Sequence, residues 1–184
     1  VGKPIKSFQA KIDPETGELL LKGPSVMKGY HNQPERTKEV IDEDGWFHTG
    51  DIAEIKNGGH IYITGRIKNM IVLSGGKKVF PEEVEAVLEK SPLFSEVCVF
   101  GLSRTFGSKD GTEEIAVVIV PKQEIIDKYS SDELEKVIRA EVKQLSSHVT
   151  AYKRPVNIIV STSPLPRTAT NKVKRKEVKA LAQV

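Results

Sequence analysis

The sequence predicts an α+β fold, with a small β-rich part over residues 1–66 and a compact domain over residues 67–184. In the first part, short apolar runs are separated by turn residues, and no long helical pattern occurs. In the second part, a hairpin is followed by apolar strands that alternate with helix-like spacing, which predicts a small mixed sheet flanked by helices. With 184 residues, of which 38% are hydrophobic and 29% charged, the chain can bury a core in one domain or in two small ones.

The β-rich part is expected to contain two hairpins and one short helix. Its first hairpin closes over residues 13–18, where proline and glycine interrupt the strand pattern. Its second hairpin closes at Lys56-Asn57-Gly58-Gly59, a sequence typical of tight turns between antiparallel strands. The expected elements are, in order, strands at 8–12 and 19–22, a short helix from Pro34, and strands at 52–55 and 60–64.

The second part is expected to contain a third hairpin, three further strands and three helices. Pro81 is expected at the first position of a helix, because its fixed φ suits that position. Asp132 is expected as the N-cap of a longer helix. A long polar loop that contains glycine joins the two central strands. The expected elements are strands at 70–73 and 77–80, a helix from Pro81, strands at 96–101 and 114–120, a helix capped by Asp132, a strand at 156–160 and a helix at 173–181.

The net charge is only +3, but positive residues are concentrated near the end of the chain. After Thr150, eight basic residues accompany a single acid, Glu177. Such a segment suggests an anionic partner, either nucleic acid or a polyphosphate ligand. Interleaved aromatic residues, zinc-ligand spacing and glycine–arginine repeats are missing from it, so nucleic acid is the less favoured partner. The basic residues are Lys153, Arg154, Arg167, Lys172, Lys174, Arg175, Lys176 and Lys179.

The single cysteine, Cys98, excludes an internal disulfide, and its apolar neighbours predict a buried strand thiol rather than a nucleophile. The four histidines show no metal-ligand spacing, so no metal site is predicted. No apolar run approaches the roughly eighteen residues of a membrane span, and we expect a cytoplasmic location. The chain opens without methionine, on residues typical of the middle of a sheet, so we expect it to be part of a longer protein.

Asp51 and Arg66 are the first pair of candidate site residues. Asp51 follows a glycine in an expected turn, where its carboxylate could accept both hydroxyls of a ribose. Arg66 follows the strand at 60–64, and its planar guanidinium suits a phosphate or a ribose edge. Since one short hairpin separates the two residues, together they could bind the two ends of a nucleotide monophosphate.

Two further segments could contact a ligand. Ser74-Gly75-Gly76 forms the expected tip of the third hairpin, where two glycines let a ligand approach the backbone closely, although a simple turn explains them equally well. Lys172 lies on a small polar loop and could offset negative charge that develops on a phosphorus centre. Taken alone, however, this loop is better explained as a solvated basic tail.

Together these segments resemble the C-terminal part of the adenylate-forming superfamily, which includes acyl-CoA synthetases, luciferases and peptide-synthetase adenylation domains. The resemblance covers essentially all 184 residues, and the motifs follow the family's order. Lys68 and the segment from Pro81 favour acyl-CoA synthetases, and the Lys172 loop is similar to that of prokaryotic long-chain fatty-acid–CoA ligases. The motifs are Gly45-Trp46-Phe47-His48-Thr49-Gly50-Asp51, Gly65-Arg66-Ile67-Lys68-Asn69, Ser74-Gly75-Gly76, Pro81-Glu82-Glu83-Val84-Glu85, and Pro166-Arg167-Thr168 through Lys172.

The resemblance implies a ligase that works in two steps. A carboxylic acid, expected to be a long-chain fatty acid, attacks the α-phosphate of ATP and gives an acyl-adenylate and pyrophosphate. The thiol of coenzyme A (CoA) then displaces AMP. The roles that the resemblance implies are ribose binding by Asp51, ribose and phosphate contact by Arg66, adenosine contact by Ile63, catalysis of the first step by Lys172, a hinge at Lys68, and a path for CoA at Ser74 and Gly75.

The resemblance also implies that most of the enzyme lies upstream of this chain. Residues 1–66 would end the large domain and residues 67–184 would form a mobile lid, while the phosphate loop, the acyl pocket and most contacts to Mg²⁺ would precede Val1. We therefore expect no activity from this chain alone, and peripheral membrane association of the complete enzyme is compatible with the resemblance. Asn171 stands where the family usually has glycine, but asparagine tolerates left-handed backbone. An aryl acid, a carrier-protein thiol acceptor, or a basic nucleic-acid-binding module are the alternatives.

Overall fold

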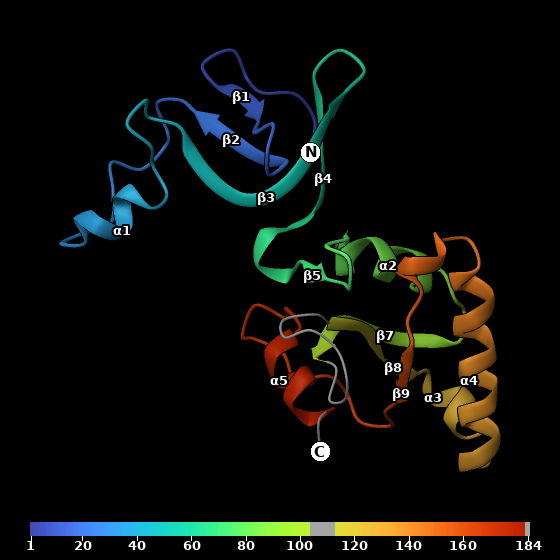
Figure 1. Ribbon diagram of the computed structural model, residues 1–184. Coiled ribbons are helices and arrows are strands. Elements are labelled where there is room, and N and C mark those ends of the chain that lie inside the picture. The colour runs from blue at the N-terminus through green and yellow to red at the C-terminus, as the bar shows by residue number, and fades with distance from the viewer. Residues whose placement is uncertain (104–112, 183–184) are drawn as a thin grey trace. The chain divides into compact units, whose positions relative to one another are not determined.

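The computed structural model describes residues 1–103 and 113–182, and the chain divides into two compact units, Val1–Lys68 and Asn69–Val184 (Figure 1). The α+β class predicted from the sequence is confirmed, because the chain combines several small sheets with short helices. The long polar loop that the sequence predicts between the two central strands falls on residues 104–112, outside the described residues.

The first unit is built on a four-stranded antiparallel sheet with the strand order β1-β2-β3-β4. Both expected hairpins are present, since β1 pairs with β2 and β3 pairs with β4. Leu19, Ala53 and Ile61 form its small buried core. The elements are β1 (Gln9–Ile12), β2 (Glu18–Lys22), α1 (Pro34–Lys38), β3 (Phe47–Lys56), β4 (His60–Arg66) and, at its end, the 3-10 turn η1 (Ile67–Asn69).

Strand β3 is longer than predicted, and this corrects the prediction that Asp51 lies in a turn. The strand begins at Phe47, because its first two residues pair with β2. Gly50 has a φ of 71°, which glycine adopts without strain and which bends the chain without ending the strand. Asp51 therefore lies within the sheet, directly opposite Arg66 of β4.

The second unit combines a two-stranded hairpin, β5-β6, with a three-stranded mixed sheet in the order β7-β8-β9. Strand β8 is antiparallel to β7 and parallel to β9. The sequence predicts these strands and the three longer helices, but not the short helix α3. The elements are β5 (Ile71–Val72), β6 (Lys78–Val79), α2 (Pro81–Leu88), β7 (Phe94–Ser103), β8 (Glu113–Pro121), α3 (Gln123–Ile126), α4 (Ser131–Ser146), the 3-10 turn η2 (Ala151–Lys153), β9 (Asn157–Val160) and α5 (Arg175–Leu181).

Strands β7 and β8 are buried on both faces (Figure 1). Along β7, Val97 and Val99 pack with residues of α2 and α4, whereas Cys98 and Phe100 pack with Val178 of α5. Because helices cover both faces, these strands form continuous apolar runs instead of an alternating pattern. The second unit therefore has a three-layer core with α5 on one side and α2 and α4 on the other.

Helix α4 is capped by Ser130 and not by Asp132, which corrects the prediction. Ser130 keeps an extended backbone, and the helix begins at the next residue. The Ser130 hydroxyl donates to the Glu133 carboxylate at 2.7 Å, and the Ser130 backbone N–H donates to it at 3.1 Å. These bonds lower the pKa of Glu133. The Glu133 side chain bonds back to Ser130 across the first turn, as in a capping box. The helix therefore begins at Ser131, two residues earlier than it would if Asp132 were its N-cap.

Candidate functional site

Asp51 and Arg66 form an ion pair across two paired strands of the first unit. They are opposite each other in the register of β3 and β4, and Arg66 Nε lies 2.7 Å from Asp51 Oδ1. The carboxylate is 18% exposed and the guanidinium is 48% exposed. The pair therefore presents donors and acceptors together at an accessible place, which suits the hydroxyl and phosphate groups of a nucleotide.

Glu18, which sequence reasoning missed, holds the segment that contains Asp51. It is only 7% exposed, and its carboxylate accepts a hydrogen bond from the Gly50 N–H at 2.7 Å and lies 2.9 Å from His48 Nδ1. On the other side, the Asp51 N–H donates to the Thr49 hydroxyl at 3.1 Å. A glutamate at the head of an apolar strand is a signal of a buried acid, but its partners lie thirty residues away and leave no local pattern.

Ile63 and Lys68 follow in the same unit. Ile63 lies on β4 and is 46% exposed, so an apolar surface is available there to a ligand or to another part of the protein. Lys68 is an exposed residue of η1. It is also the last residue of the first unit, so the chain passes between the units at the position predicted for a hinge.

Ser74 and Gly75 lie at the exposed tip of the β5-β6 hairpin, which the Leu73 N–H closes by donating to the Lys77 carbonyl at 2.9 Å. Gly75 and Gly76 have φ values of 82° and 75°, a conformation that other residues rarely adopt. Among the described residues, apart from chain neighbours, no atom lies within 4 Å of where a Cβ would stand at either glycine. The tip is thus open to the approach of a ligand.

Lys172 lies on a short hairpin between residues 167 and 173, which pair as an antiparallel bridge. The Thr168 N–H donates to the Lys172 carbonyl at 2.8 Å, and Asn171 has a left-handed φ of 63°, as its tolerance for this conformation predicts. Within the described part of the chain, the exposed Lys172 ammonium has no ion pair or hydrogen bond. Because the hairpin includes Val173, the last helix begins at Arg175 and not at Val173, a correction to the prediction.

Most basic residues after Thr150 are neutralised, largely by acids from outside this segment. Five of the eight form ion pairs. Four of the five acidic partners come from elsewhere in the second unit, so the segment is less positive than its sequence suggests. The pairs are Lys153–Glu83, Arg167–Glu96, Lys174–Glu177, Arg175–Glu85 and Lys179–Glu113.

The structure brings together only part of the predicted site. Asp51 and Arg66 are in contact, whereas Lys172 and the Ser74–Gly75 tip lie on two different hairpins of the second unit. Among the described residues, no hydrogen bond or ion pair joins these two hairpins. Within the first unit, Asp51 and Arg66 form a pair suited to a nucleotide; within the second unit, the bare hairpin tip and Lys172 lie on different hairpins.

Cys98 is buried and 1% exposed, as predicted. Burial raises the pKa of its thiol to about 11, although the Arg175 guanidinium 3.7 Å away favours the thiolate. Burial also lowers the pKa of Arg175, but hydrogen bonds to Glu85 and the charge of that residue raise it overall. A protonated, buried thiol at neutral pH is not a nucleophile.

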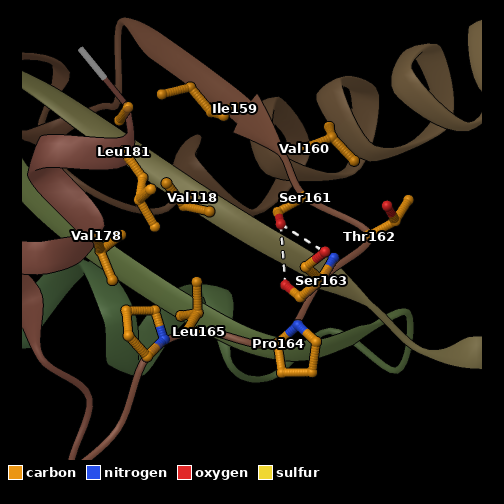
Figure 2. A pocket seen from close by; sticks show the side chains of 12 residues that line it. Val118, Ile159, Val160, Ser161, Thr162, Ser163, Pro164, Leu165, Val178 and Leu181 are labelled. Carbon is orange, nitrogen blue, oxygen red and sulfur yellow. Dashed lines mark hydrogen bonds between the residues drawn. The ribbon is translucent and has the colours of Figure 1, made fainter. Parts of the chain in front are cut away.

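A pocket of about 370 Å³ in the second unit contains none of the predicted site residues (Figure 2). It lies between β8, β9, the segment 161–166 and α5. Its walls are largely apolar, and on its polar side the Ser161 hydroxyl donates to the Ser163 carbonyl at 2.9 Å (Figure 2). Because no charged side chain of the described residues lines it, the pocket offers a nucleotide no ion pair there.

Two further properties concern metals and membranes. Within residues 1–103 and 113–182, no cluster of three or more histidine, cysteine, aspartate or glutamate side chains could hold a metal ion. No helix in the same part of the chain is both long and apolar enough to span a bilayer.

The fold agrees with that of a known protein family. Residues 68–182 match the family described as the AMP-binding enzyme C-terminal domain. The chain belongs to this family of adenylate-forming enzymes, which confirms the resemblance inferred from the sequence.

Its relatives include ligases for different acids. The medium/long-chain-fatty-acid–CoA ligase FadD8 of Mycobacterium tuberculosis (strain ATCC 25618 / H37Rv) is 37% identical over 179 residues, which cover 97% of this chain and 29% of the relative. Malonate–CoA ligase of Arabidopsis thaliana is 35% identical, with coverage of 97% and 30%. The structure of o-succinylbenzoate CoA synthetase (MenE) from Bacillus subtilis with its acyl-adenylate intermediate has a TM-score of 0.76, an identity of 30% and coverage of 97% and 35%. The chain thus spans 29% to 35% of the length of these proteins.

Proposed function

We propose that this chain is the C-terminal part of an AMP-forming acid–CoA ligase whose acid is a long-chain fatty acid. The acid attacks the α-phosphate of ATP to give an acyl-adenylate and pyrophosphate, and the CoA thiol then displaces AMP to give a thioester. Lys172 is the main support for this proposal. In the described part of the chain it is an exposed cation without a partner, on an ordered hairpin, while five of the other basic residues after Thr150 are paired.

In this proposal Asp51, Arg66 and Ile63 bind the nucleotide. The Asp51 carboxylate accepts hydrogen bonds from the ribose hydroxyls, and the Arg66 guanidinium contacts the ribose and a phosphate oxygen. Their ion pair holds both groups in place before the nucleotide arrives, so less side-chain entropy is lost on binding. The half-exposed Ile63 offers an apolar surface to the adenosine.

Lys172 and the hairpin tip act in different steps. In the first step the Lys172 ammonium offsets the negative charge that develops around the α-phosphate and the attacking carboxylate. In the second step the pantetheine arm of CoA passes along Ser74 and Gly75; among the described residues, apart from chain neighbours, no atom lies within 4 Å of where a Cβ would stand at Gly75. A rotation at Lys68 would exchange the two hairpins at the active centre, with residues 1–66 in the large domain and residues 67–184 as the lid.

The most specific part of the proposal is the identity of the acid substrate. FadD8 supports a fatty acid, whereas malonate–CoA ligase and MenE are named for other acids at similar identity. An enzyme for an aryl acid, or one with a carrier-protein thiol as acceptor, would use the same residues of this chain in the same roles. The acyl pocket and the Mg²⁺ that accompanies ATP belong, in this proposal, to the part of the protein upstream of Val1.

A basic nucleic-acid-binding module is the second candidate, and the charge pattern disfavours it. A module of this kind requires several cations that are free to contact phosphates. Here five of the eight basic residues after Thr150 pair with acids. We propose instead a cytoplasmic ligase, which in complete form would associate peripherally with the membranes that contain its lipid substrate.

The proposal is tested by acid-dependent ATP–pyrophosphate exchange. The complete polypeptide encoded by the gene and this chain are each assayed with a panel of fatty acids, malonate and aryl acids. Exchange by the complete polypeptide alone, fastest with a long-chain fatty acid, is the expected result. Exchange that is fastest with another acid would overturn the substrate assignment, and a folded polypeptide that gives no exchange with any acid would overturn the ligase assignment.

A further inference from the structure

The peptide unit before Lys172 is held at both ends. Its carbonyl, on Asn171, accepts a hydrogen bond from Arg167 Nη1 at 2.9 Å. Its N–H, on Lys172, donates to the Thr168 hydroxyl at 3.1 Å. A peptide plane fixed at the carbonyl and at the amide cannot rotate freely. The direction in which the Lys172 side chain leaves the backbone is therefore set by Arg167 and Thr168.

Arg167 also ties this hairpin to the core of the second unit. Its other terminal nitrogen, Nη2, donates to Glu96 Oε2 at 2.7 Å, and the Glu96 carboxylate is only 13% exposed. Glu96 lies on β7, next to the buried Val97, at a shift in register between β7 and β8 that begins after Phe94. Such irregularities change the direction of a side chain within a sheet. One guanidinium thus joins a rigid strand to the residue that precedes Lys172.

The chain that follows the hairpin is also held against the second unit, through Arg175 at the start of α5. Arg175 donates to the Val99 carbonyl at 2.6 Å and pairs with Glu85 of α2. Glu96, which holds Arg167, and Val99, which holds Arg175, both belong to strand β7. The Arg175 side chain is 23% exposed and contacts three groups, Glu85, Val99 and Cys98, whereas that of Arg167 is 36% exposed. Arg167 is consequently the anchor that can be changed with less risk to the fold.

We propose that Arg167 and Glu96 are positioning residues for Lys172 in the first half-reaction. The inference rests on the proposed function and adds to it a reason why the free lysine is accurately placed. A flexible lysine that stabilises charge needs a fixed starting point, because a displacement of about 1 Å can cost roughly a hundredfold in rate. Arg167 provides this point only while Glu96 holds its second nitrogen.

The test uses the complete enzyme and two substitutions, Arg167→Gln and Glu96→Gln. Each should lower the rate of adenylation about tenfold, measured by acid-dependent ATP–pyrophosphate exchange. Each should leave thioester formation from supplied acyl-adenylate and CoA within about twofold, because Lys172 is not needed in that step. The double variant should be no slower than Arg167→Gln, since both substitutions act on the same connection: Arg167→Gln removes it, and Glu96→Gln weakens it by removing the charge of its acceptor.

Arg139→Gln is the matched control. Arg139 pairs with Glu135 on α4, with Nε and Nη2 at 2.8 and 2.7 Å from Glu135 Oε1, and it lies outside the Lys172 hairpin. It should leave both half-reactions unchanged. Adenylation by Arg167→Gln and Glu96→Gln at the control's rate overturns the proposal. Equal losses in both half-reactions also overturn it, because a general loss of structure explains them.

The same experiment separates this inference from the proposed function. If Arg167→Gln does not fold, Glu96→Gln gives the answer by itself, because it leaves the bond from Arg167 to Asn171 in place. If the unchanged enzyme does not exchange, or if Lys172→Ala adenylates normally, the proposed function fails and this inference fails with it. If Lys172→Ala is slow and both positioning variants are fast, only the inference fails.

Discussion

At the scale of single residues, Asp51 shows how a local motif and a distant partner make one site. Asp51 lies opposite Arg66 because β3 pairs with β4, and this strand pairing is enough to bring the two side chains into contact. Its backbone, however, is fixed by the buried Glu18 through Gly50. The proposed nucleotide-binding pair is thus supported by Glu18, to which no ligand contact is assigned.

Asp51→Ala should weaken ATP binding more than it weakens the fold. In the complete enzyme we expect the KM for ATP to rise about tenfold or more, because the ribose hydroxyls lose a charged acceptor worth roughly 1.5–3 kcal/mol. The change in the free energy of unfolding should stay below about 1 kcal/mol, since Arg66 is half exposed and water replaces its partner. Steady-state kinetics and urea unfolding measure the two effects.

Glu54→Ala is the control for this prediction. Glu54 is also an acid of β3 that pairs with a basic residue, Lys56, but both side chains are more than half exposed. Its removal should change neither quantity. If Asp51→Ala unfolds the protein at ordinary temperatures, Asp51 is a structural residue and the nucleotide assignment is wrong.

At the scale of elements, sequence patterns located the hairpins and the starts of α1 and α2, but not those of α3, α4 and α5. Glycine and asparagine in the turn at residues 56–59 and the proline at position 81 act locally, so they are visible in the sequence. The length of β3 was missed, because it depends on pairing with β2 and on a positive φ at Gly50. The Arg167–Glu96 contact was missed for a similar reason, since 71 positions separate the two residues.

Ser130→Ala tests the corrected N-terminus of α4. Because the Ser130 hydroxyl and backbone N–H both bond to Glu133, we expect the free energy of unfolding to fall by about 1 kcal/mol, the usual effect of losing a cap. Asp132→Ala, one residue into the helix, should cost less than about 0.5 kcal/mol. Urea unfolding of the complete protein measures both, and a larger effect at Asp132 would restore the original prediction.

At the scale of the whole molecule, the chain separates into two units whose proposed tasks differ. The first contains the Asp51–Arg66 pair, and the second contains the Lys172 hairpin and the bare β5-β6 tip. Two hairpins on one unit, each suited to a different step, are what a rotating lid requires. The resemblance, and not composition or periodicity, is what implies this division of tasks, because local residue spacing does not encode the geometry of a moving domain.

The most direct test of this account is the effect of Lys172→Ala on the two half-reactions of the complete enzyme. Adenylation should slow by at least ~100-fold, the scale for loss of a preorganised group that stabilises charge. Thioester formation from supplied acyl-adenylate should continue at nearly the original rate. Lys176→Ala, which removes another exposed lysine without an acid partner among the described residues, should leave both rates unchanged. Equal losses in both half-reactions, or no loss in adenylation, would contradict the account.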